Sequence, residues 1–209
     1  MNPQIAAILD FWFAGTRERP QDLRDRMGFW FGAGIDRTER EQRDREIAER
    51  FGGLVEAAAK GEFDDWSQDP RGRLALILLL DQFPRNLHRG TADAFRYDEQ
   101  ALNLTLTGLE HGFADALTPT ERAFFLMPLQ HSERLADQER ALREYDALVH
   151  EVPETLRTAF QNFADHARLH HDIVARFGRF PHRNAILGRP STPAERDYLA
   201  SDAPTFGQS

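Results

Sequence analysis

The stretch Leu74-Ala75-Leu76-Ile77-Leu78-Leu79-Leu80 decides the fold. Because a helix made of these residues has no polar face, it must be buried on all sides. The run is also far shorter than the roughly 20 apolar residues that span a bilayer. The next residues are Asp81-Gln82-Phe83-Pro84-Arg85-Asn86, of which Asp81 and Gln82 are expected to end the helix and the rest to form a loop. The sequence therefore predicts a buried central helix with neighbours on every side.

Helix starts elsewhere share one pattern, in which a capping residue precedes a proline at the first helical position. Proline suits this position because the backbone N–H that it lacks has no intrahelical partner there. After Thr118 and Thr192, a glutamate three residues further on completes a capping box. The pattern occurs at Asn2-Pro3, Asp69-Pro70, Thr118-Pro119 and Thr192-Pro193.

Apolar residues recur at helical spacing through most of the chain, and no segment alternates long enough to predict a strand. The sequence thus predicts an all-α fold of seven to eight helices, stacked as antiparallel pairs in a single domain over residues 1–200, with a tail at 201–209. Two similar aromatic segments, Phe11-Trp12-Phe13 and Phe29-Trp30-Phe31, are expected to fill one core. Beyond the first helix and the apolar run, helices are expected at 36–61, 91–110, 119–130, 133–150 and 153–177.

Composition restricts the possible functions of the 209-residue chain. With no cysteine, it has neither disulfides nor thiolate chemistry, and a net charge of −8 argues against nucleic acid as a partner. Lys60 is the one lysine among 26 basic residues, and this excess of arginine fits either GC-rich codon usage or the recognition of carboxylate or phosphate. The N-terminal sequence does not resemble a signal peptide. We expect a cytoplasmic protein without a membrane partner or a cofactor.

Two segments far apart in the sequence carry nearly the same residues. Phe83-Pro84-Arg85-Asn86 and Phe180-Pro181-His182-Arg183-Asn184 each follow a predicted helix and end in an Arg-Asn pair. Arginine forms bidentate contacts with carboxylate or phosphate, and the neighbouring side chains would orient such a ligand. We therefore predict an anion pocket. Its ligand-binding residues would be Asp81, Gln82, Arg85, Asn86, His182, Arg183 and Asn184.

Histidines provide a second set of candidate residues. His131 and Glu133 could act as acid and base, and His170 lies on the apolar stripe of the helix at 153–177. The pair His166 and His170 has the spacing of a helical zinc motif but lacks the glutamate that follows the first histidine, so no metal is expected. Ser132 cannot form a triad with its two neighbours, because consecutive helical side chains point about 100° apart. A purely structural role, in which these groups satisfy buried helix ends, is also open.

The charged segment from Asp36 to Arg50 is expected to form the solvent-exposed face of a helix, on which Glu and Arg side chains form ion pairs. No function is assigned to it.

The motifs around Trp12, Asp81, His131 and Arg183 together resemble a bacterial family known as domain of unknown function 924. The resemblance extends from Ile8 to about Leu199 and implies an α-helical superhelix similar to tetratricopeptide repeats. It implies no function. The residues at its motif positions are Asp81, Gln82, Arg85, Asn86, His131, Glu133, His170, Arg183 and Asn184.

These observations predict a binding protein that holds an anionic small molecule or a peptide carboxylate in a concave pocket lined by Arg, Asn and His. One alternative is an enzyme, hydrolase-like, in which His131 and Glu133 act on an anionic substrate held by the arginines. Another is an interaction protein whose polar cluster is only an internal brace. In the last case, carboxylates or backbone carbonyls would occupy every donor of Arg85 and Arg183.

Overall fold

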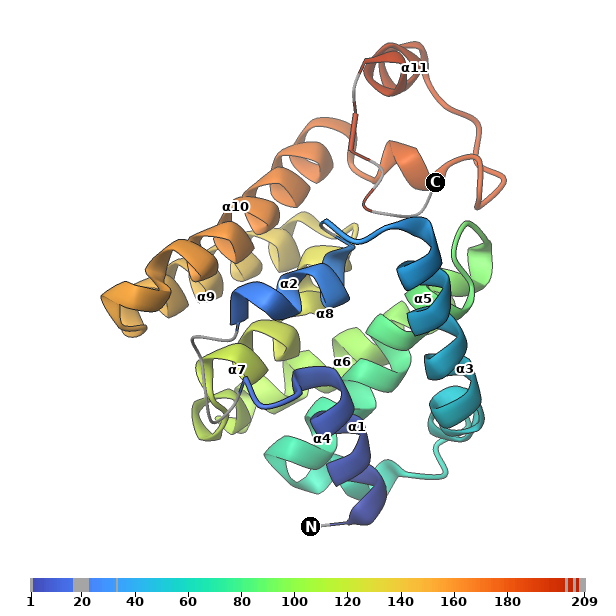
Figure 1. Ribbon diagram of the computed structural model, residues 1–209. Coiled ribbons are helices and arrows are strands. Elements are labelled where there is room, and N and C mark those ends of the chain that lie inside the picture. The colour runs from blue at the N-terminus through green and yellow to red at the C-terminus, as the bar shows by residue number, and fades with distance from the viewer. Residues whose placement is uncertain (1, 17–22, 33, 202, 205, 207–209) are drawn as a thin grey trace.

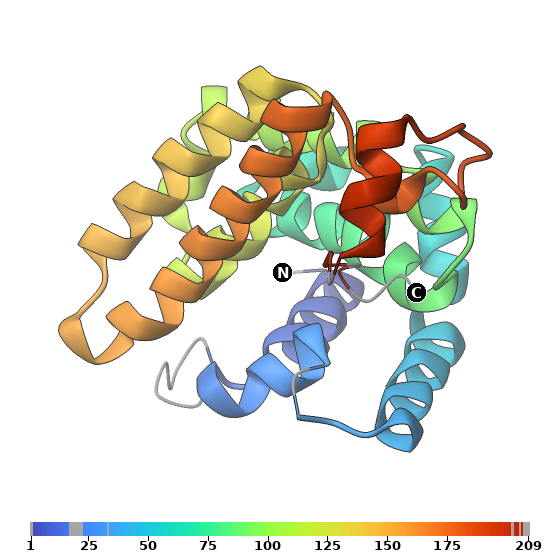
Figure 2. The ribbon, with the colours of Figure 1, turned by 90° about the horizontal axis from the view of Figure 1, so that it is seen from above.

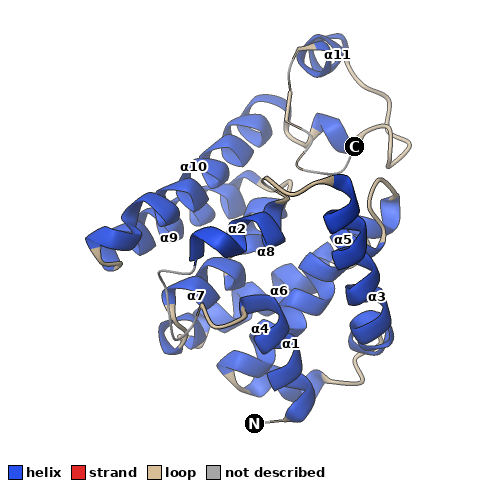
Figure 3. Cartoon of the chain, in the orientation of Figure 1, coloured by secondary structure: helices blue, strands red, loops and turns tan. Residues whose placement is uncertain are grey.

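The computed structural model describes residues 2–16, 23–32, 34–201, 203, 204 and 206, and these contain helices and no strands (Figure 3). The all-α class is therefore confirmed. Short 3₁₀ turns cover 64–68, 92–95, 113–116 and 181–183. The α-helices are α1 (Pro3–Phe13), α2 (Leu23–Phe31), α3 (Arg37–Ala59), α4 (Pro70–Ile77), α5 (Phe83–Leu87), α6 (Asp98–Glu110), α7 (Pro119–Phe125), α8 (Met127–His131), α9 (Leu135–Glu151), α10 (Glu154–Phe177) and α11 (Pro193–Ala200).

The four capping signals all mark helix starts. The Asn2 side chain accepts a hydrogen bond from the Gln4 amide, so that α1 begins at Pro3, and Asp69 caps α4 in the same way. Complete capping boxes begin α7 and α11. A further capping box, between Asp36 and Glu39, begins α3.

The central helix does not end at Gln82. It continues through a π-helical turn, Leu78–Gln82, directly into α5, so the expectation of a loop at 83–86 is wrong. Pro84 is the physical reason: it has no N–H to donate to the carbonyl four residues earlier. The turn before it widens instead, and the Phe83 amide bonds to the Leu78 carbonyl in an i to i−5 pattern. Such turns occur frequently at functional sites.

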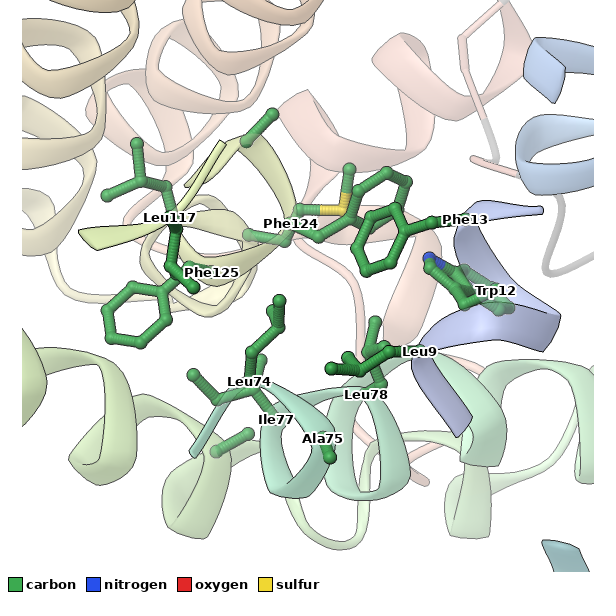
Figure 4. Packing of buried hydrophobic residues seen from close by; sticks show 14 of the residues in the cluster. Leu9, Trp12, Phe13, Leu74, Ala75, Ile77, Leu78, Leu117, Phe124 and Phe125 are labelled. Carbon is green, nitrogen blue, oxygen red and sulfur yellow. The ribbon is translucent and has the colours of Figure 1, made fainter. Parts of the chain in front are cut away.

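The apolar run Leu74–Leu80 is buried throughout, as its composition predicts. Its neighbours are aromatic: Trp12 and Phe13 of α1 and Phe124 of α7 converge on it from the other side of the core (Figure 4). The two aromatic segments also meet, since the rings of Phe13 and Trp30 are 6.2 Å apart. Both segments thus belong to one core, as expected.

Two predicted helices are interrupted. The segment 91–110 contains a 3₁₀ turn before α6, and the segment 119–130 divides at Leu126 into α7 and α8. Pro128 lies in the first turn of α8, where its missing N–H and fixed φ are tolerated. Helix α8 ends at His131 and so brings this histidine to a helix terminus.

Helices α9 and α10 form an antiparallel pair that is side by side in both views (Figures 1 and 2). A tetratricopeptide-like superhelix and a single domain over 1–200 stay predictions. The predicted tail 201–209 includes residues 202, 205 and 207–209, which lie outside the described residues. Within the described part of the chain, no helix combines the length and apolarity needed to cross a membrane.

Candidate functional site

A cavity of about 260 Å³ lies among helices α2, α3, α5, α8 and α10, which are labelled in Figure 1, and the 3₁₀ turn at 181–183. One part of its wall is apolar, with Trp30 and Phe31 of α2 and Phe163 of α10 among its residues, and the other part is rich in arginine and histidine. Its described lining contains no Asp or Glu. The lining residues are Met27, Trp30, Phe31, Gly32, Arg40, Arg43, Gln82, Arg85, Asn86, Arg89, Phe95, Met127, Gln130, His131, Asn162, Phe163, His166, His170, Phe180, His182, Arg183 and Phe206.

The two Arg-Asn segments meet at one carboxylate. Arg85 binds Asp98 of α6 in a bidentate manner, with Nη1 and Nη2 at 2.8 and 2.9 Å from its two oxygens. Arg183 reaches the same carboxylate with Nη1 at 3.4 Å. Arg85 also donates from Nη1 to the Asp81 carbonyl at 2.6 Å. Asp98 therefore fixes both guanidinium groups at the cavity wall.

Asp81 lies behind this wall and has no exposed surface. Its carboxylate accepts hydrogen bonds from His131 Nδ1, at 2.7 Å, and from Gln82 Nε2, and it lies 3.1 Å from Arg85 Nη1. Burial alone would raise the pKa of Asp81, but the charge of Arg85 and the hydrogen bonds from His131 and Gln82 lower it below its ordinary value. The group is therefore an ionised carboxylate at neutral pH.

Three histidines of the wall are held uncharged. Burial, followed by the charge of Arg85, lowers the pKa of His131. Burial also lowers the pKa of His170 well below its ordinary value, and it lowers that of His182 to about 3. Both His170 and His182 have a buried Nδ1 without a hydrogen-bond partner among the described residues. The cavity thus combines cationic guanidinium groups with neutral imidazoles.

These histidines predict a stability that falls on acidification. The unfolded chain takes up protons near pH 6.5, whereas the folded state resists them, so each histidine removes up to about 1.4 kcal/mol of unfolding free energy per pH unit below that value. Urea denaturation of wild type and His170→Gln at pH 7 and pH 5 checks this. We expect a smaller loss between the two pH values in the variant, and equal losses would contradict the assignment of His170.

The structure brings together seven of the ten sequence-predicted site residues on the cavity wall. Asp81 supports this wall from behind, while Glu133 and Asn184 lie elsewhere. The seven on the wall are Gln82, Arg85, Asn86, His131, His170, His182 and Arg183.

Glu133 and Asn184 belong to a separate brace centred on Arg189. Glu133 accepts from Arg189 Nη1 and Nη2 at 2.6 and 2.9 Å, and from the Phe180 amide at 2.8 Å. Asn184 is buried, accepts from Arg189 Nε and donates to Ser191. The brace holds the segment that carries Arg183, and we leave both residues out of the proposed site.

Sequence reasoning missed the contribution of α3. Its exposed pairs, Arg37–Glu41 and Arg50–Glu46, form as expected. Arg43, however, is buried beside Asp44, and both Arg40 and Arg43 line the cavity. The residues around a buried arginine of such a charged helix are the same as those around a solvent-exposed one, so the local sequence does not distinguish the two. Only the excess of arginine in the composition was a weak signal for these residues.

A metal does not fit the described part of the cavity. The rings of His131 and His170 lie near each other, with centroids 5.9 Å apart. Among the residues that the structure describes, no three His, Asp or Glu side chains are grouped so that they could hold an ion.

Comparison with known proteins identifies the family. A family model described as bacterial protein of unknown function (DUF924) matches residues 8–203. The chain belongs to the DUF924 family. A solved structure of a protein of unknown function from Agrobacterium tumefaciens is 39% identical to this DUF924 protein, with a TM-score of 0.69 over 88% of this chain and 98% of that chain. A comparison with the curated proteins finds no match. The function of this DUF924 protein must therefore be argued from its site.

Proposed function

We propose that the protein binds a small organic anion in the cavity. The surroundings of Arg183 are the observation on which this proposal rests. Its guanidinium lies between the rings of Phe95 and Phe180, 4.4 and 4.5 Å from their centroids. Nε is buried and has no hydrogen-bond partner among the described residues. Burial lowers the pKa of Arg183 to about 10, which leaves it charged at neutral pH. A brace would use every donor of this side chain, whereas a binding site keeps one for its ligand.

The charge balance of the wall supports an anion. Four of the five arginines in the described lining pair with Asp44, Asp81 or Asp98, and these three carboxylates lie outside that lining. Arg43 and Arg89 pair with Asp44, at 3.0 and 3.2 Å. The described lining therefore contributes positive and no negative side-chain charge to a space in which electrostatic interactions are stronger than in water. This local excess exists although the whole chain is acidic.

The size and the apolar part of the wall favour a small molecule over a peptide. Ligand sites usually have about 300–1,000 Å³, and this cavity lies just below that range. Trp30, Phe31 and Phe163 offer aromatic surface. The ligand class that fits both parts is an anion, carboxylate or phosphate, on a compact apolar body.

Arg183→Gln is expected to weaken binding of such anions. A hydrogen bond to a charged group contributes about 1.5–3 kcal/mol, which corresponds to roughly a 10- to 150-fold loss of affinity. Phenylphosphate and benzoate are suitable probes, with benzamide as the neutral analogue. Calorimetry gives the affinities, and thermal shifts give an independent check, because a ligand of the native state raises the midpoint.

The matched control is Arg157→Gln, which removes a half-exposed arginine in the first turns of α10, outside the lining. We expect this control to bind both anions with the affinity of wild type. We expect the Arg183→Gln and Arg157→Gln variants to bind benzamide with equal affinity. Equal affinities of wild type and Arg183→Gln, or no binding of either anion by wild type, would contradict the proposal.

A further inference from the structure

The contact between Asp81 and His131 defines the protonation of the histidine. Nδ1 lies 2.7 Å from a carboxylate oxygen that is buried and ionised, so this nitrogen carries the proton and donates it. The proton of a neutral imidazole is then absent from Nε2, which keeps its lone pair. The His131 side chain is 12% exposed and lines the cavity. Since Nδ1 points to a residue with no exposed surface, the opposite edge of the ring, with Nε2, is the edge available to a ligand.

The surroundings of His131 are suited to a base. The charged and titratable groups that face it are Asp81, Arg85, Asp98 of α6 and His170 of α10. Burial and Arg85 oppose protonation, whereas the two carboxylates favour it, and the result is a pKa below the ordinary value. His131 is therefore unprotonated at neutral pH, and a base needs this state at the start of a reaction.

An anion held by arginines beside a base reacts at its own centre only if that centre is electrophilic. The carbon of a carboxylate is not attacked by water, but the phosphorus of a phosphate ester is. A singly charged diester is the better fit, because Arg85 and Arg183 already share the charge of Asp98 and a doubly charged monoester would need more positive charge to balance it. The described lining also contains no Ser, Thr, Cys, Tyr or Lys, so water is the nucleophile at hand.

We propose that this protein hydrolyses a small phosphodiester, with His131 as the general base and Asp81 as the positioning residue that orients it. This inference rests on the anion site proposed above, because Arg85 and Arg183 would hold the phosphate group. The same two guanidinium groups would stabilise the negative charge that grows on the phosphoryl oxygens as water attacks.

The step balances without a further reactant. A water proton passes to Nε2 of His131 while the water oxygen forms a bond to phosphorus. The bond from phosphorus to one ester oxygen breaks, and its electron pair leaves with that oxygen. The departing alkoxide takes the proton from the imidazolium, which returns His131 to its starting state. The products are an alcohol and a phosphate monoester, and Asp81 stays ionised throughout.

Bis(4-nitrophenyl) phosphate tests the proposal, because its hydrolysis releases coloured 4-nitrophenolate. We expect wild type to turn it over and His131→Gln to lose about 100- to 10,000-fold in kcat/KM, the usual contribution of a general base. His150→Gln, which removes an exposed histidine at the end of α9, should match wild type. The neutral ester 4-nitrophenyl acetate and the monoester 4-nitrophenyl phosphate should be poor substrates.

Asp81→Asn separates positioning from a merely structural role. The carboxylate charge raises the pKa of His131, so its loss should move the acidic limb of the pH–rate profile to lower pH as well as reduce kcat. A structural defect alone would lower the rate and leave the profile in place.

The phenylphosphate titration keeps this proposal distinct from the preceding one. If phenylphosphate binds with dependence on Arg183 while bis(4-nitrophenyl) phosphate is not hydrolysed, or is hydrolysed equally by wild type and His131→Gln, the hydrolytic proposal is overturned and the anion site stands. If phenylphosphate and benzoate do not bind, both proposals fail.

Discussion

Asp81→Ala is expected to lower the free energy of unfolding by about 3 kcal/mol, the lower end of the range for breaking a buried ion pair. The carboxylate is wholly buried between His131 and Arg85. Its removal leaves the His131 donor without its partner, whereas Arg85 keeps Asp98, which is why the lower end applies. Urea denaturation at pH 7 measures the loss. Glu41→Ala, at a half-exposed position on α3, should change stability by about 0.5 kcal/mol or less.

The pH dependence of this difference tests its electrostatic origin. The folded-state pKa of Asp81 lies below the unfolded value of about 3.9, so the charge contributes fully above that pH and is lost as the pH falls toward the folded pKa. The stability gap between wild type and Asp81→Ala should thus be constant near neutrality and shrink below about pH 4. A gap that stays the same down to pH 3 would mean that packing, and not charge, accounts for the loss.

Phe124→Ala is expected to cost about 3–5 kcal/mol of unfolding free energy, the range for removing a large aromatic side chain from a core. Phe124 has no exposed surface, and its ring lies 4.6 to 6.1 Å from those of Trp12, Phe13, Trp30 and Phe163. These neighbours come from three helices, α1, α2 and α10, which limits how far the site can collapse around a void. Thermal or urea denaturation gives the value, and a loss below about 1 kcal/mol would contradict the packing described here.

The same substitution should also affect the cavity, because Trp30 and Phe163 contact Phe124 and line the binding space. Phenylphosphate affinity should therefore fall with Phe124→Ala. Phe113→Ala provides the comparison: this ring is half-buried, lies outside the lining and packs against His111. It should cost less stability and leave the affinity unchanged.

Local signals in the sequence were enough to predict the class of the fold and most helix starts. Caps such as Asp69 and Thr118 act within three residues, and the apolar run Leu74–Leu80 admits no other interpretation than burial. The π-helical turn had no such signal within the run, and Pro84, which causes it, is more often found at the end of a helix. In a run without polar residues, the sequence does not show which side chains share a face of the helix. A change from i−4 to i−5 hydrogen bonding therefore leaves the apolar pattern unaltered.

The candidate site was predictable where the motif residues themselves line the cavity, as Arg85, His131 and Arg183 do. It was not predictable where a distant residue decides the role. Glu133 is two positions from His131, yet Arg189, 56 residues further along, takes both of its oxygens. No pattern near Glu133 contains that information, since the pairing arises from tertiary packing.

The π-helical turn also constrains how this chain can vary. It acts as a single-residue insertion in an otherwise continuous helix from Pro70 to Leu87. If the same residues formed a regular α-helical turn instead, everything after the turn would be rotated by about 100°. Arg85 would then face away from Asp98, and Asp81 would no longer meet His131. The polar wall thus depends on an uncharged residue as well as on its charged ones: a variant without Pro84 loses the reason for the wide turn, and with it the orientation of Arg85, even if every charged side chain is retained.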